Sequence, residues 1–303
     1  MLTYLKALIV AVLVFASSVE SSQSDFWRGI KLTGVKAKLL DASLPEGSRI
    51  VAPPSLVAGR TATLSVVSPQ GDMLKGVVVV VAGQEHVSDS KGKVSFTVPE
   101  GRSPVEARIK DFKGALAIRT AVAATSSDFD ANLSPIIAKV PRYHIIGSDI
   151  TIEGGPFDGD IDSNRVRIGD RDISVLASSP TSLVTASPKG LQPGDSRPLT
   201  VATQQGESPA VNLTFIRIRM EASATNLLKG QNAKGRIIVE GTRERVWLRI
   251  TNLTPNVIRL KGGDSLTVRT EGGSDNAAEI KFTGVSTGGF TINAEVIKDM
   301  QSN

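Results

Sequence analysis

The sequence predicts an all-β chain of about three tandem β-sandwiches. Apolar and polar residues alternate with a period of two, which buries one face of each short strand. Clear runs are Ile150–Ile152, Val166–Ile168 and Val211–Phe215. Glycine, proline, serine and aspartate cluster between the runs, where turns need fixed or positive φ angles. Apolar residues at helical spacing are absent, and several short strands in about 80 residues are typical of a sandwich.

The first 23 residues (1–23) are predicted to be a signal peptide. Lys6 supplies a positive charge, Ala7–Ala16 is an apolar core, and Ala16–Ser18 offers small residues for cleavage. The core is too short to span a bilayer comfortably, which favours a cleaved signal peptide over the alternative, an uncleaved N-terminal anchor. Export would place the protein in the periplasm, at the cell surface or outside the cell. Contact with the membrane would then occur only through the transient signal peptide.

Residues 24–47 are expected to form a lead-in segment, and residues 48–124 a first sandwich. Strands of this sandwich are predicted at 61–67, 77–82, 93–98, 105–111 and 115–122. The run Thr61–Val67 alternates and predicts one wet face, whereas five valines at 77–81 predict a strand buried on both faces. The turn Asp89–Gly92, followed by V-x-F-x-V-P, resembles bacterial immunoglobulin-like and carboxypeptidase-regulatory-like modules.

A polar linker, 125–133, leads to a central module at 134–216. The motifs of this module are Pro135-Ile136-Ile137, Val140-Pro141, Gly147 with ITIEGGPF, Asn164, Val166, Gly169, SSPTSLVTASP, LQPGD and VNLTFI. In this order they resemble the IPT/TIG domain (immunoglobulin-like, plexin and transcription factor). The resemblance implies an immunoglobulin-like sandwich with an extracellular or modular role and no shared catalytic residues. It extends the fold prediction to tandem immunoglobulin-like β-sandwiches.

Residues 217–297 are expected to form a third, C-terminal β-sandwich, and residues 298–303 a tail. Its strands are predicted at 236–240, 245–251, 257–260, 265–270, 278–283 and 289–296. Glycine pairs separate several of them. Because almost no linker follows residue 216, we expect the second and third domains to share a continuous strand edge.

The chain offers little for catalysis. Cysteine is absent, which excludes disulfides, thiolate zinc sites and a cysteine nucleophile, and favours a bacterial exported protein. The two histidines, His86 and His144, stand apart from serine and acidic groups in the sequence and are expected at the surface. We therefore predict no enzyme, no catalytic residues and no cofactor.

One loop alternates oxygen ligands in the manner of a calcium site, at Asp158, Asp160 and Asp162. An EF-hand loop needs glycine at its sixth position and glutamate at its twelfth, where this chain has Ser163 and Gly169. No metal site is therefore predicted. A solvated polar loop is favoured over calcium binding.

The chain carries a net charge of +5 without a run of five like charges, which indicates an ordinary mixed surface. Some relatives of the central module bind DNA. This module holds seven basic and nine acidic residues, whereas duplex binding needs cations that neutralise phosphates. Together with the export signal, this charge predicts no nucleic acid partner.

The predicted strand around Val246, Leu248 and Ile250 carries the candidate partner-binding residues. If those three side chains face inward, Arg245, Trp247 and Arg249 share the outer face. A tryptophan flanked by two arginines could stack on a sugar, a peptide or an anionic polymer. In the alternative interpretation, the tryptophan packs against a neighbouring domain and the arginine stems cover it.

These features predict an exported, non-enzymatic protein of the cell envelope or cell surface with an adhesive, binding or scaffold role. Its partner would be an envelope protein or a polysaccharide. The alternative is a carbohydrate-binding accessory protein, which scarce aromatic residues, 4% of the chain, disfavour.

Overall fold

The computed structural model describes residues 44–110, 118–124, 132–223 and 227–297. The predicted signal peptide, most of the lead-in segment, most of the linker and the tail lie outside these residues. Within the described part, no helix is long and apolar enough to cross a membrane.

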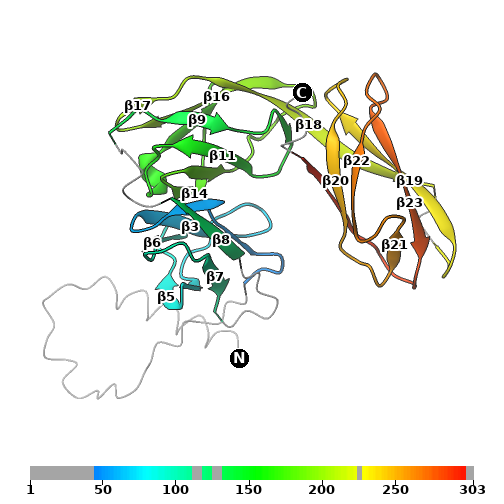
Figure 1. Cartoon of the computed structure of the whole chain (residues 1–303), viewed down its shortest axis with the longest axis horizontal. Helices are drawn as coiled ribbons and strands as arrows, with labels where there is room; N and C mark the ends of the chain where they lie inside the picture. The colour runs from blue at the N-terminus through cyan, green and yellow to red at the C-terminus, as the bar shows by residue number, and fades with distance from the viewer. Residues whose placement is uncertain (1–43, 111–117, 125–131, 224–226, 298–303) are drawn as a thin grey trace, which may run out of the picture. The chain divides into compact units, whose positions relative to one another are not determined.

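Strands make up nearly all the regular structure (Figure 1). The first group comprises β1 (Arg49–Val51), β2 (Ser55–Val57), β3 (Thr61–Val67), β4 (Val78–Val81), β5 (Gln84–Val87), β6 (Lys93–Thr97), β7 (Val105–Ile109) and β8 (Ile118–Ala124). The second comprises β9 (Ile136–Lys139), β10 (Tyr143–Ile145), β11 (Ile150–Gly155), the 3₁₀ helix η2 (Ile161–Ser163), β12 (Arg165–Ile168), β13 (Arg171–Ile173), β14 (Val175–Ser179), β15 (Ser182–Thr185), β16 (Ser196–Thr203), β17 (Gly206–Glu207) and β18 (Val211–Ala222). The third comprises β19 (Asn232–Glu240), β20 (Trp247–Asn252), β21 (Ile258–Leu260), β22 (Ser265–Arg269), β23 (Ala277–Gly284) and β24 (Ile292–Val296).

The first sandwich encloses an aliphatic core between the sheet β2-β8-β7-β4-β5 and the strands β1, β3 and β6. Val79 and Val81 of β4 point into this core, whereas Val78 and Val80 are partly exposed. The prediction that the valine run is buried on both faces is therefore wrong. The reason is that this sheet packs on the core with one face only.

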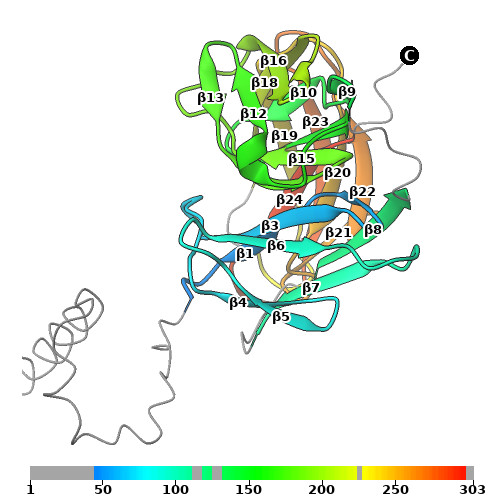
Figure 2. The same cartoon turned by 90° about the vertical axis from the view of Figure 1, so that its left-hand side faces the viewer.

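Strand β3 shows the opposite error, because every residue after Thr61 is buried. The face that carries Thr63, Ser65 and Val67 was expected to be wet, but the central sandwich covers it. Val67 belongs to a small apolar cluster with Leu176 and Ala177, and Thr63 pairs with Ser178 of β14. Strand β3, which also pairs with β1 and β6 (Figure 2), thus meets β14 of the central sandwich through this single residue pair (Figure 1).

The central sandwich packs the strands β14-β15-β11-β9 against β13-β12-β16-β18. Its core contains fully buried side chains from both layers, among them Ile150, Ile152, Leu199 and Phe215. The alternation read at Ile150–Ile152 and Val166–Ile168 places these apolar side chains inward, as predicted.

The third sandwich packs β18-β19-β23-β21 against β22-β20-β24 around Ile237, Leu248 and Phe282. Strand β18 belongs to both the second and third sandwiches. Its first residues pair with β16, and Arg217–Ala222 pair with β19. The expected continuous strand edge is therefore confirmed, as is the all-β class of tandem immunoglobulin-like sandwiches. The domain boundaries remain predictions.

Candidate functional site

The predicted partner-binding residues lie on or beside β20, the middle strand of the sheet β22-β20-β24. Val246, Leu248 and Ile250 are completely buried, as the alternation predicts. Arg245 and Arg249 are exposed, and Trp247 is partly exposed. The three candidate residues therefore share the outer side of this sheet, which we call the Trp247 face.

A third arginine, Arg269, completes the surroundings of the indole. It lies directly opposite Trp247 in the β20–β22 ladder, and its guanidinium carbon is 5.4 Å from the ring centroid. This distance is within the range of a cation–π contact. Sequence reasoning missed Arg269, because only the pairing register of β20 and β22 reveals this neighbour.

The two predicted arginines extend the Trp247 face in different directions. The Nε of Arg245 donates a hydrogen bond to the carbonyl oxygen of Glu271 at 3.2 Å. Arg249 lies between Thr267 of β22 and Glu295 of β24 in the ladder. The face thus presents an aromatic ring among three guanidinium groups, with one carboxylate at the margin. A partner role for it remains a prediction.

The histidines occupy structural positions. His144 was expected at the surface, but it is buried on β10, because its ring packs edge-on against Phe215 at 5.8 Å. Its Nε2 lies 2.9 Å from the carbonyl oxygen of Ser148 and 3.4 Å from the hydroxyl of the same residue. Because the Ser148 carbonyl can only accept, Nε2 carries the proton toward it, and the Ser148 hydroxyl donates to the carbonyl of Ile145 at 2.7 Å. His86 lies on β5 and is partly exposed.

The loop with the alternating aspartates makes contacts with the first sandwich. Asp160 accepts from the backbone amide of Asp162 and so caps η2. The Oδ2 of Asp162 forms ion pairs with the Nζ of Lys91 at 2.7 Å and the Nζ of Lys93 at 3.0 Å. Among the described residues, no group of three or more histidines and carboxylates is placed to hold a metal ion. Lys91 and Lys93 of the first sandwich lie against the carboxylates of Asp160 and Asp162.

These contacts change the acidity of the groups involved. Hydrogen bonds from Lys91 and Lys93 hold the pKa of Asp162 below its ordinary value. Burial alone would lower the pKa of Lys93, but its hydrogen bonds to Asp162 and Asp160 outweigh this effect and raise the pKa. Asp162 and Lys93 are therefore both ionised at neutral pH, and their ion pair joins the two sandwiches electrostatically.

The central sandwich can be assigned to a family. Residues 136–215 match the family model of the IPT/TIG domain. This match confirms the resemblance found in the sequence, and it covers about a quarter of the chain. No curated protein matches the chain.

Several solved structures resemble the chain at low identity. A Bacteroides ovatus glucan-utilisation protein, SGBP-B, solved with a mixed-linkage heptasaccharide, is 12% identical, with 80% of this chain and 72% of that chain covered and a TM-score of 0.30. The Escherichia coli adhesin FdeC is 11% identical, with coverage of 83% and 93% and a TM-score of 0.23. An auxiliary nutrient binding protein from Bacteroides ovatus is 19% identical, with coverage of 33% and 24% and a TM-score of 0.22. Likenesses at these TM-scores carry no inference about what this chain binds.

Proposed function

We propose that the chain is an exported, non-enzymatic binding protein of the cell envelope or cell surface, with an adhesive or scaffold role. The observation that carries this proposal is the Trp247 face. Tryptophan and arginine are the residues most enriched among the energetic anchors of protein interfaces. The face combines an indole with three arginines on a rigid sheet, so that little backbone entropy is lost on binding.

The geometry favours a protein partner over a neutral sugar. A sugar platform needs an open ring face, but Arg269 lies over the indole of Trp247. A partner segment with carboxylates can instead pair with the guanidinium groups and pack an apolar side chain beside the ring. We therefore take an envelope protein as the partner, and a carbohydrate-binding accessory role is the alternative.

Co-sedimentation with isolated envelope of the source organism tests the proposal. We expect the purified protein to sediment with the envelope, and a prior protease treatment of the envelope to abolish this. The R245A/W247A/R249A variant should bind more than tenfold more weakly, because loss of an interface anchor costs about 2 kcal/mol or more. A variant with two exposed arginines of the central sandwich replaced, R165A/R171A, is the control.

Two results would count against a protein partner at this face. Equal sedimentation of the triple variant and the wild type would exclude the Trp247 face. Binding that survives protease treatment would support the carbohydrate alternative. A change of tryptophan fluorescence on titration with envelope glycans would then locate the contact if it is lost in W247F, since Trp27 also fluoresces.

A further inference from the structure

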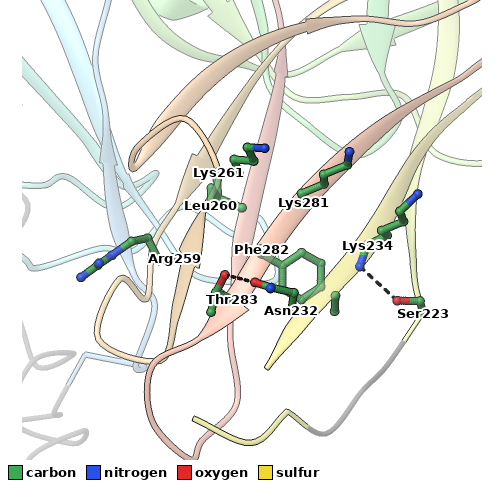
Figure 3. A pocket seen from close by; sticks show the side chains of 10 residues that line it. Ser223, Asn232, Lys234, Arg259, Leu260, Lys261, Lys281, Phe282 and Thr283 are labelled. Carbon is green, nitrogen blue, oxygen red and sulfur yellow. Dashed lines mark hydrogen bonds between the residues drawn. The ribbon is translucent and has the colours of Figure 1, made fainter. Parts of the chain in front are cut away.

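The other sheet of the third sandwich, which does not contain β20, carries a pocket of about 620 Å³. It lies over the strands β19, β23 and β21. Its lining comprises Ser223, Asn232, Ala233, Lys234, Arg259, Leu260, Lys261, Lys281, Phe282 and Thr283 (Figure 3). Four of these residues are cationic and none is acidic, so the pocket is a concentrated positive site.

The lysines of the pocket form a row across three strands. Lys234 lies directly opposite Lys281, and the backbone amide of Lys261 donates to the carbonyl of Lys281 at 2.8 Å. All three side chains are exposed, and they extend to the same side of the sheet in Figure 3. Because neighbouring strands are about 4.8 Å apart, the row spans about 10 Å.

The next row of the same sheet face has the opposite character. There Arg236 lies between Glu221 of β18 and Glu279 of β23, so that charges alternate across the strands. Like charges directly opposite one another destabilise a sheet, and opposite charges stabilise it. Glu279 is the carboxylate paired with Lys234 at 3.2 Å and with Lys281 at 3.6 Å, so it faces two ammonium groups with one charge. The lysine row therefore carries excess positive charge that a bound anion would neutralise.

The other lining groups indicate the chemistry of that anion. Ser223, Asn232 and Thr283 add hydroxyl and amide groups beside the ammonium groups. Phe282 is only 1% exposed, so the pocket lacks an open ring of the kind on which nucleic acid bases stack. Point charges mixed with hydroxyl and amide partners suit a sugar chain that carries carboxylates.

We propose that the Lys234–Lys281–Lys261 row binds a carboxylated polysaccharide, separately from the Trp247 face. The inference rests on the proposed export, because export brings envelope glycans within reach. It assigns the chain a second partner class on the opposite sheet of the same sandwich.

Calorimetric titration with polygalacturonate, and with its methyl-esterified form as the neutral counterpart, tests this site in the purified protein. We expect the wild type to bind the acidic polymer and not the ester, with binding that weakens as salt rises. The K234Q/K281Q/K261Q variant should bind at least tenfold more weakly. Its melting temperature should change little, because the substitution removes both the like-charge repulsion within the row and the exposed ion pairs to Glu279.

A variant that removes three other exposed cations, K75Q/R102Q/K189Q, is the matched control and should bind as the wild type does. Failure of the wild type to bind polygalacturonate, equal binding of the ester, or equal binding by the K234Q/K281Q/K261Q variant would overturn the proposal. Tighter binding of single-stranded DNA than of polygalacturonate would also overturn it. The R245A/W247A/R249A variant should retain polygalacturonate binding, which separates failure of this site from failure of the proposed function.

Discussion

The IPT/TIG domain contacts its neighbours through two junctions of different construction. Its junction with the first sandwich joins residues far apart in the chain, such as Thr63, whose hydroxyl donates to the carbonyl of Gly159 at 2.7 Å, 96 residues away. The buried hydroxyls of Ser179 and Ser182 donate hydrogen bonds to the carbonyl of Ser55 across the same junction. We call this set of hydroxyl contacts, with that of Thr63, the hydroxyl seam. Its junction with the third sandwich is instead one continuous strand, β18.

The difference shows two ways of making tandem sandwiches act as a unit. The first junction depends on nonlocal packing, so each buried polar group needs its partner in the other sandwich. The second junction depends on the covalent backbone, and side-chain contacts such as Tyr143 with Thr242 only support it. We therefore expect substitutions at the first junction to cost more than substitutions at the second.

The largest effect should come from G159V. A Cβ atom at Gly159 would overlap the carbonyl oxygen of Thr61 in the first sandwich. Since both sides of this contact are backbone, we expect the free energy of unfolding to fall by about 3 kcal/mol. Differential scanning calorimetry should show the first sandwich unfolding in a separate, earlier transition. The control is G289V, a position with open space around it, and equal destabilisation of both variants would contradict the prediction.

T63V tests the hydroxyl seam without adding bulk. The substitution removes the buried donor to Gly159 and a partner of Ser95, at 2.9 Å from its hydroxyl. We expect a loss of about 1–2 kcal/mol, because a buried carbonyl is left unsatisfied. Urea denaturation measures it, with T61V on the exposed start of the strand as the control. A loss no greater than that of T61V would show that the seam contributes little.

Y143F tests the second junction. It removes the hydroxyl that accepts a hydrogen bond from Thr242 at 3.2 Å, and we expect a cost of about 1 kcal/mol. A double-mutant cycle with T242V isolates the pair. A coupling larger than the loss in T63V would reverse the ranking of the two junctions.

D162N should have the smallest effect, about 0.5 kcal/mol, because the side chains of Asp162 and Lys91 are 45% and 64% exposed. The folded-state pKa of Asp162 is lowered, so its stabilisation is present above the unfolded-state pKa of about 3.9 and is lost as the pH falls through the folded value. The stability difference between wild type and D162N should therefore disappear in acid. D170N is the control, and a difference that does not shrink at all as the pH falls below about 3.9 would exclude this ion pair as its source.

The sequence predicted the structural features that depend on apolar–polar alternation within one strand. The alternation at Val246, Leu248 and Ile250 is local, and it correctly placed Trp247 on the outer face. The stacking of Arg269 on Trp247 could not be predicted, because it depends on the register between two strands. The same holds for the lysine row, whose members come from β19, β23 and the residue that follows β21.

The seam with the first sandwich was misread for a different physical reason. Thr63 and Ser65 alternate with apolar residues and so indicate a face open to water, although both are completely buried. Short hydroxyl side chains occur in both environments: the buried Thr63 hydroxyl donates to the carbonyl of Gly159, whereas the Ser65 hydroxyl is buried without a hydrogen-bond partner among the described residues. Burial of such a face is decided by the neighbouring domain, which the strand's own sequence does not describe.

Strand β18 also has a mechanical consequence. It is 12 residues long, so it extends about 40 Å, and its two ends are anchored in different sandwiches. A tension applied between these sandwiches is carried by one continuous backbone, with no loop between them that could extend under load. Antiparallel hydrogen bonds lie perpendicular to the strands, so a pull along β18 loads its hydrogen bonds to β16 and β19 in shear. All the hydrogen bonds of each ladder then bear the force at the same time. For a protein held between a cell and a partner, this strand would act as a tether that yields only when a whole ladder shears.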